Sequence, residues 1–230
     1  MTTLNTLTTP PVSALITQLF AEDDAARTVL EREIDTLPAE ARDAVMSLAH
    51  NDFRAFYARA KDIPLAVSRE TGTLLYLLAR ACQARTIVEF GTSFGLSTLH
   101  LAAALRDNGG GRLIGSEFEP SKVERARQNI AAAGLSDLVE IRAGDALDTF
   151  ACDMPATIDL VLLDGAKVLY PSVLALLEPR LRAGALIIAD NSNDSPEYLA
   201  HVRAAGGGYL SLPFAEDVEL SIRLDDSCSP

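Results

Sequence analysis

The chain has 230 residues, of which 48% are hydrophobic, and its formal net charge is −12. This length and composition suit one globular domain with a small appendage, and they exclude a disordered chain. An acidic chain of this kind is also a poor partner for nucleic acid or for an anionic membrane surface, because both would repel it.

The first third of the chain has apolar residues at helical spacing, which predicts helices between residues 12 and 82. This spacing is seen at Val12, Leu15, Ile16 and Leu19, and again at Val29, Leu30, Ile34, Leu37, Val45, Leu48, Phe53 and Phe56. Pro38 and Pro64 stand where helices could start, and the stretch from Leu65 to Cys82 is predicted to be a further helix.

From Thr86 onward, short apolar runs alternate with amphipathic segments. The strand-like runs are TIVEF, RLIGSEF, VEIRAG, IDLVLLD and ALIIAD, and helical segments such as LSTLHLAAALRD and YPSVLALLEPRLRAG separate most of them. LVLLD and LIIAD are apolar throughout, as parallel strands buried on both faces are. The pattern predicts a doubly wound α/β fold. The final runs, YLSLPFA and DVELSIRL, have no helix between them and predict an antiparallel pair at a sheet edge.

The cysteines Cys82, Cys152 and Cys228 are widely spaced and form no CxxC pair. We therefore expect no zinc ribbon or redox motif, but reduced thiols in a cytoplasmic protein. The N-terminal segment lacks a basic region followed by a continuous apolar run, so we expect no signal peptide. No window of the sequence is apolar enough to predict a membrane span.

Polar residues at the predicted strand ends are the first candidates for a ligand site, because ligands of open α/β sheets bind there. The first strand leads into a GxxxG turn from Gly91 to Gly95, which lacks the GxGxxG spacing that suits a dinucleotide pyrophosphate. Glu117, ending the second strand, could accept hydrogen bonds from a ribose, as in both NAD enzymes and methyltransferases, or simply cap the strand. Asp145, after the third strand, could accept from an adenine amino group, cap the next helix, or do both.

The fourth and fifth strands end in Asp164 and in Asp190-Asn191. Adjacent parallel strands would bring these side chains together, and two carboxylates with an amide oxygen suit Mg²⁺ or another hard divalent cation. The competing interpretation is that each Asp caps a helix and that Asn191 makes a turn. Lys167, three residues after Asp164, is either a solvated surface lysine or a general base whose pKa is lowered by a metal and by burial.

The region from about Leu65 to Leu224 resembles the metal-dependent class I O-methyltransferases, the catechol and caffeoyl-CoA group. VEFGTSFGLST is similar to the first cofactor motif of that family, and GSEFEP is similar to its ribose-binding segment. VLLDGAKVLYPSVLALLEPRLRAGALIIADN resembles the metal and lysine region in order and spacing. The family has a Rossmann-like sheet of seven strands, which the resemblance implies for residues 65–230, with residues 1–64 as an N-terminal helical extension.

The resemblance implies S-adenosylmethionine as the cofactor and a role for individual residues. Metal ligands would be Asp164, Asp190 and Asn191, and Lys167 would be the catalytic base. The cofactor pocket would be formed by Val67, Glu89, Gly91, Thr92, Ser97, Glu117, Phe118, Asp145, Ala146 and Asp164. We expect a small hydroxylated, catechol-like substrate, no nucleic-acid or membrane partner, and a homodimer.

Three features depart from the family pattern: the loop after Asn191 is short, the chain has no tryptophan, and the N-terminal 60 residues do not clearly match. An aromatic wall at the substrate site would therefore have to come from Phe or Tyr. The alternatives to a metal-dependent O-methyltransferase are a metal-independent methyltransferase, a nicotinamide-dependent oxidoreductase and a non-catalytic cofactor-binding protein.

Overall fold

A single sheet with strand order β3-β2-β1-β4-β5-β7-β6 forms the centre of the computed structural model, which describes residues 5–42, 48, 51–215 and 217–224. Its strands are β1 (Thr86–Phe90), β2 (Arg112–Glu117), β3 (Val139–Ala143), β4 (Ile158–Leu163), β5 (Leu181–Ala189), β6 (Tyr209–Phe214) and β7 (Val218–Arg223). β1 to β5 pair in parallel, whereas β7 pairs antiparallel with β5 and with β6. The predicted fold class and the antiparallel edge pair are confirmed.

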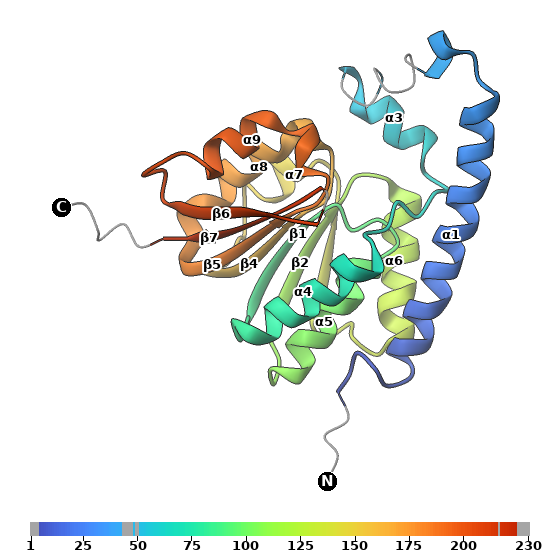
Figure 1. The fold of residues 1–230 in the computed structure, drawn as a ribbon. Coiled ribbons are helices and arrows are strands. Elements are labelled where there is room, and N and C mark those ends of the chain that lie inside the picture. Colours follow the sequence, from blue (N-terminus) through green and yellow to red (C-terminus); the bar gives the residue numbers. More distant parts are fainter. Residues whose placement is uncertain (1–4, 43–47, 49–50, 216, 225–230) are drawn as a thin grey trace.

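Helices cover both faces of this sheet (Figure 1). The helices described by the structure are α1 (Val12–Thr36), α3 (Phe53–Arg59), α4 (Arg69–Ala81), α5 (Leu96–Asp107), α6 (Pro120–Ala132), α7 (Ala146–Thr149), α8 (Tyr170–Leu177) and α9 (Pro196–Val202). Short 3-10 turns follow β4 (Lys167–Leu169), α8 (Glu178–Arg180) and β5 (Ser192–Asp194). Within the described ranges, no helix is long and apolar enough to cross a membrane.

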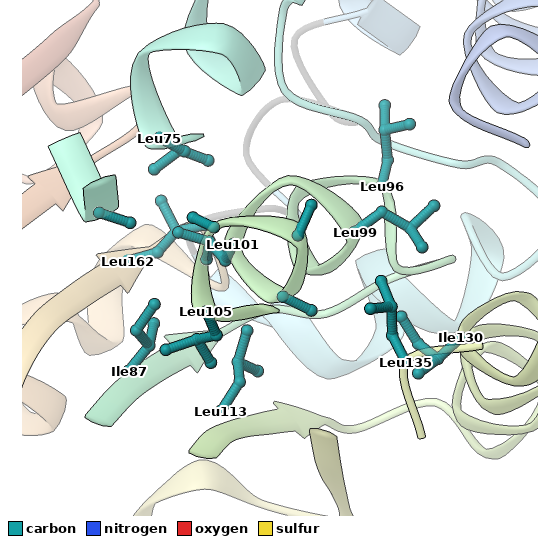
Figure 2. Packing of buried hydrophobic residues seen from close by; sticks show 14 of the residues in the cluster. Leu75, Ile87, Leu96, Leu99, Leu101, Leu105, Leu113, Ile130, Leu135 and Leu162 are labelled. Atoms are coloured by element: carbon teal, nitrogen blue, oxygen red, sulfur yellow. The ribbon is translucent and has the colours of Figure 1, made fainter. Parts of the chain in front are cut away.

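The buried side chains form two clusters, one on each face of the sheet. On one face α5 is buried on nearly all sides, because its sequence LSTLHLAAALRD is apolar around most of its circumference. Leu99, Leu101 and Leu105 of this helix pack among side chains of β1, β2, β4, α4 and α6 (Figure 2). On the other face α7, α8 and α9 pack through buried side chains that include Phe150, Tyr170 and Tyr198.

The N-terminal helices are part of the same body. α1 runs along α5 and α6 (Figure 1), and its Leu19 and Phe20 are buried in the first cluster. The guanidinium of Arg125 on α6 lies 3.0 Å from the carboxylate of Glu22 on α1. The predicted boundary between an N-terminal extension (1–64) and a second domain (65–230) remains a prediction. The described residues on either side of this boundary are in close contact.

Some predicted boundaries are wrong. The helix predicted from Leu65 begins only at Arg69. The side chain of Ser68 accepts a hydrogen bond from the backbone N–H of Thr71 and so caps the start of this helix. Pro64 therefore does not start a helix. The segment YPSVLALLEPRLRAG is helical only to Leu177, and β5 begins at Leu181, because pairing with β4 outweighs the helical pattern. The predicted helical position Val45 lies outside the described residues.

Candidate active site

The turn after β1 brings the backbone of two strand ends into close contact. Gly91 has φ +95°, and a Cβ built there would lie 2.5 Å from the carbonyl oxygen of Asp164. Only glycine fits this combination of a left-handed backbone and a backbone neighbour. Gly95 also has positive φ and stands at the N-terminus of α5. The predicted GxxxG turn therefore holds the ends of β1 and β4 against each other.

Glu89 of β1 is completely buried and accepts hydrogen bonds from three hydroxyls. The donors are Ser97 (2.7 Å), Thr98 (2.6 Å) and Thr92 (3.1 Å). Burial raises the pKa of Glu89 to about 7, against the lowering effect of the three hydroxyls. Glu89, Thr92 and Ser97 were predicted to contact the cofactor, and the structure brings them together as a network that supports the turn. Thr92 and Ser97 also line a narrow cavity beside it.

A first cavity, lined by residues such as Glu117, Phe118, Asp145 and Ala146, opens at the ends of β1, β2 and β3. Glu117 accepts hydrogen bonds from the backbone N–H groups of Ser93 (2.7 Å) and Glu119 (2.8 Å), which orient its carboxylate. A carboxylate at this position can accept further bonds from neighbouring hydroxyls. The predicted cofactor residues of the second and third strands thus share one cavity.

Asp145 has the predicted capping role and an additional partner. One carboxylate oxygen accepts from the N–H of Leu147 (2.9 Å) at the start of α7. The other lies 2.7 Å from the guanidinium of Arg54 on α3, and Arg54 also stacks over the ring of Phe118 at 5.7 Å. The α3 helix is therefore tied to the first cavity from outside the region that resembles the family.

Sequence reasoning missed several lining residues of the first cavity. Phe53 and Tyr57 come from α3, and Lys122 comes from α6. The Lys122 side chain is buried next to Glu117 and Glu119, and burial lowers its pKa even though these carboxylates act in the opposite direction. No local signal marks these residues, since each reaches the cavity through tertiary packing.

A second and larger cavity of about 580 Å³ adjoins the first. Asp164, Lys167, Asp190 and Asn191 all line it, so the predicted metal and base residues are brought together. Register explains this, because Leu163 of β4 pairs with Ala189 of β5, and the next residues are Asp164 and Asp190. Asp164 and Leu65 line both of these cavities and the narrow one, in which Val67 also lies.

Of the carboxylates that line this cavity, the two predicted metal ligands, Asp164 and Asp190, are electrostatically strained. Burial and the neighbouring Asp164 raise the pKa of Asp190 to about 7. Burial also raises the pKa of Asp164, although Lys167 acts against it, and the Lys167 ammonium lies 3.0 Å from Oδ1 of Asp164. Burial lowers the pKa of Lys167, but Tyr170, Asp164 and Tyr57 outweigh this effect and hold it well above its ordinary value.

The side chains of Asp164, Asp190 and Asn191 offer the donor atoms that a hard divalent cation prefers. Asn191 has a left-handed backbone (φ +48°), and its amide nitrogen donates to Asp217 at 2.8 Å, which leaves the amide oxygen as the atom able to face a cation. Over the described part of the chain, no cluster of three or more His, Cys, Asp or Glu side chains suits a metal. The two carboxylates and the amide oxygen are hard ligands, and the raised pKa of Asp190 reflects its burial beside a second carboxylate. The residues therefore fit such a cation.

Solved structures with the same architecture define the class of protein. A cofactor-bound protein from MTB superposes with a TM-score of 0.68 at 24% identity, covering 96% of this chain and 94% of that one. The O-methyltransferase TomG from Streptomyces achromogenes, solved with SAM, superposes with a TM-score of 0.62 at 28% identity, covering 89% of this chain and 99% of that one. The fold is that of a Rossmann-like methyltransferase.

Sequence relatives identify the family to which the chain belongs within this class of methyltransferases. The model of a methyltransferase domain matches residues 88–192. A catechol O-methyltransferase of Niastella koreensis is 38% identical over 130 residues, covering 55% of this chain and 58% of that protein, which is less than two thirds of its length. A protein of Mycobacterium bovis named as an O-methyltransferase is 34% identical over 167 residues, covering 70% of this chain and 67% of that protein.

The chain belongs to the class I O-methyltransferase family. Glu117 alone is compatible both with nicotinamide-dependent enzymes and with methyltransferases, and family membership decides for the methyltransferases.

Proposed function

We propose that this protein is an S-adenosylmethionine-dependent O-methyltransferase that uses Mg²⁺ or another hard divalent cation and methylates a catechol-like molecule or another small molecule with neighbouring oxygens. The observation that carries the proposal is the position of Asp164, which lines the first cavity and the second cavity at once. A methyl donor in the first cavity and an acceptor in the second would meet at this residue, and holding two reactants in contact is a large part of catalysis.

The proposed cofactor position follows from the chemistry of the first cavity. Glu117 would accept hydrogen bonds from the ribose hydroxyls, while Asp145 and Phe118 would lie beside the adenine. The methionine part would extend toward the narrow cavity of Thr92, Ser97 and Val67. Glu89 would act through the hydroxyls that it holds, because its carboxylate is already surrounded by three donors.

The cation would be held by Asp164, Asp190 and Asn191 in the second cavity. When bound, it would favour the ionised form of a substrate hydroxyl near neutral pH. Asp217 would orient Asn191 through the hydrogen bond to its amide nitrogen. Asp190 would bind as a carboxylate, so its raised pKa predicts competition between the cation and a proton.

Lys167 is proposed to take the proton from the substrate hydroxyl at Nζ. A protonated ammonium has no acceptor, so this role requires the lysine pKa to fall from its value in the ion pair with Asp164. Neutralisation of the Asp164 charge would act in that direction, because the carboxylate is one of the groups that raise the lysine pKa.

A second candidate, a methyltransferase that needs no metal, is favoured by the same ion pair. Lys167 already supplies Asp164 with an opposite charge at 3.0 Å. In that case Lys167 would stay protonated and would bind an anionic oxygen of the substrate. The two candidates differ in their response to chelation.

The deciding experiment is a methyl-transfer assay with the purified protein, SAM and a panel of catechols and hydroxylated natural-product cores, with Mg²⁺ or with excess EDTA. We expect methylated product only with Mg²⁺. Asp190→Ala should lose this activity yet keep the rise in Tm that S-adenosylhomocysteine causes, whereas the surface control Asp137→Ala should behave like the wild type. Full activity in EDTA would support the metal-independent candidate instead.

We also propose a homodimer. Leu210 and Leu212 on the edge strand β6 are 63% and 51% exposed, and apolar side chains on an open sheet edge favour association. Light scattering coupled to gel filtration should give twice the chain mass, and Leu210→Lys with Leu212→Lys should give the monomer mass.

A further inference from the structure

We propose that Tyr57 is a specificity-determining residue whose ring separates the cofactor side of the site from the acceptor side and so fixes which of two neighbouring hydroxyls is methylated. This inference rests on the proposed function and adds a residue from the N-terminal region, which lies outside the stretch from about Leu65 to Leu224 whose sequence resembles the family. Its experimental test includes a measurement that does not need a substrate.

The first observation is that Tyr57 lies between the two cavities. Only three residues line both the first and the second cavity in the described part of the chain, namely Tyr57, Leu65 and Asp164. These three frame the opening between the cavities. An acceptor oxygen that approaches a methyl group through this opening has to pass beside the Tyr57 ring.

The second observation is the aromatic face of α3. Phe53, Phe56 and Tyr57 stand at positions i, i+3 and i+4 and therefore share one side of the helix. Phe53 faces the first cavity, Phe56 faces the second, and Tyr57 faces both. The second cavity has one further aromatic residue, Phe20 of α1. The aromatic wall that the sequence could not locate is thus supplied by the N-terminal helices.

The third observation is that the Tyr57 ring is held at both ends. Its hydroxyl donates a hydrogen bond to the carbonyl of Gly165 at 3.3 Å, directly after Asp164. Burial raises the pKa of Tyr57, against an opposing effect of Lys167, so the hydroxyl stays protonated and remains a donor at neutral pH. Gly165 packs closely against the Phe90 ring, since a Cβ built on it would lie 2.4 Å from that ring.

The backbone of α3 is also anchored. The side chain of Asp52 accepts a hydrogen bond from the N–H of Ala55 at 3.0 Å and caps the helix. Arg54, on the next residue position after Phe53, pairs with Asp145 at 2.7 Å. A ring fixed in this way can discriminate between two orientations of a planar acceptor, because only one orientation avoids overlap with it.

The test compares Tyr57→Ala, Tyr57→Leu and Tyr57→Phe with the wild type on 3,4-dihydroxybenzaldehyde, whose two hydroxyls give distinguishable methyl ethers. Removing the ring should change the ratio of 3-O- to 4-O-methyl product by about threefold or more and raise the KM for the acceptor. Tyr57→Phe keeps the ring but loses its hydrogen bond to Gly165, so its product ratio should lie between those of the wild type and the ring-deleted variants. Tyr76→Phe, which loses a hydroxyl that binds Asp107 away from the cavities, is the matched control.

A second measurement uses S-adenosylhomocysteine alone. Because Tyr57 lines the first cavity, Tyr57→Ala or Tyr57→Leu should weaken its binding about three- to tenfold in calorimetry, with Tyr76→Phe unchanged. An unchanged product ratio in a folded ring-deleted variant would overturn the proposal. If the wild type methylates no catechol, the proposed function fails, and unchanged S-adenosylhomocysteine binding would then overturn the role of Tyr57 separately.

Discussion

The ammonium of Lys167 lies 3.0 Å from Oδ1 of Asp164, and both side chains are largely buried. A buried ion pair of this kind means that Lys167 and a divalent cation would compete for the same carboxylate. Removing the lysine should therefore strengthen binding of the divalent cation but slow methyl transfer.

Lys167→Met should bind Mg²⁺ about tenfold more tightly than the wild type in calorimetry, because a competing positive charge is gone. Its kcat should fall by about 100-fold or more if Lys167 is the base. The exposed Lys61, changed to Met, serves as the control and should alter neither value. Unchanged Mg²⁺ binding by Lys167→Met would mean that the cation does not use Asp164.

The pH dependence of stability gives a second prediction. An aspartate in the unfolded chain has a pKa of about 3.9, whereas Asp190 in the folded protein has a pKa of about 7. Between these values the folded form keeps a proton that the unfolded form has lost, so the contribution of Asp190 is present at low pH and is lost as the pH rises through 7. Glu89, whose pKa is also about 7, acts in the same direction.

Without metal, Asp190→Asn should therefore be more stable than the wild type at pH 8 by about 1 to 3 kcal/mol, with a smaller difference at pH 5. Urea unfolding at both pH values measures this difference. Mg²⁺ should stabilise the wild type at pH 8 and have little effect on the variant, and its affinity for the wild type should fall about tenfold per pH unit below 7. Equal stability of the two proteins at both pH values would contradict the raised pKa.

The sequence allowed the strand-end residues to be predicted because their positions follow from short-range patterns. Glu117, Asp164 and Asp190 each come directly at the end of an apolar run, and parallel pairing brings such ends to one edge. Tyr57 and Lys122 could not be found in this way. They reach the cavities from helices whose positions depend on packing between distant segments, such as the contact of Arg54 with Asp145.

The hydrogen-bond partners of Glu89 could not be predicted from its type and its position in the sequence. Glu89 was predicted to line the cofactor pocket, whereas its carboxylate is enclosed by the hydroxyls of Ser97, Thr98 and Thr92. Two of these hydroxyl residues come from the first turn of α5 and one from the turn before it. Their side-chain directions depend on how α5 packs against β1, which no pattern in the sequence specifies.

The Glu89 network gives a third prediction. Glu89→Ala should lower the free energy of unfolding by about 3 kcal/mol or more, because three buried hydroxyls lose their acceptor. Glu89→Gln should cost about 1 kcal/mol at pH 5, since hydroxyls can rotate to donate to or accept from an amide, and less at pH 8, where it also removes a buried charge. Urea unfolding of both variants measures the difference. A loss in Glu89→Gln as large as that in Glu89→Ala would show that the negative charge, and not the hydrogen bonding, is what the network needs.

The contact between Gly91 and Asp164 gives the last prediction. Gly91→Ala should lower the free energy of unfolding by about 3 kcal/mol or more, for two reasons. The new Cβ would lie 2.5 Å from the backbone oxygen of Asp164, and residue 91 has a left-handed backbone that alanine rarely adopts. Gly134→Ala is the matched control, since Gly134 has φ +69° and open space around its Cβ position, so it should cost only about 1 to 2 kcal/mol. Gly91→Ala should also weaken binding of S-adenosylhomocysteine and Mg²⁺ together, because the displaced Asp164 lines both cavities. If the two alanine variants were equally stable and bound both ligands equally well, the close approach of β1 and β4 would not be what positions Asp164.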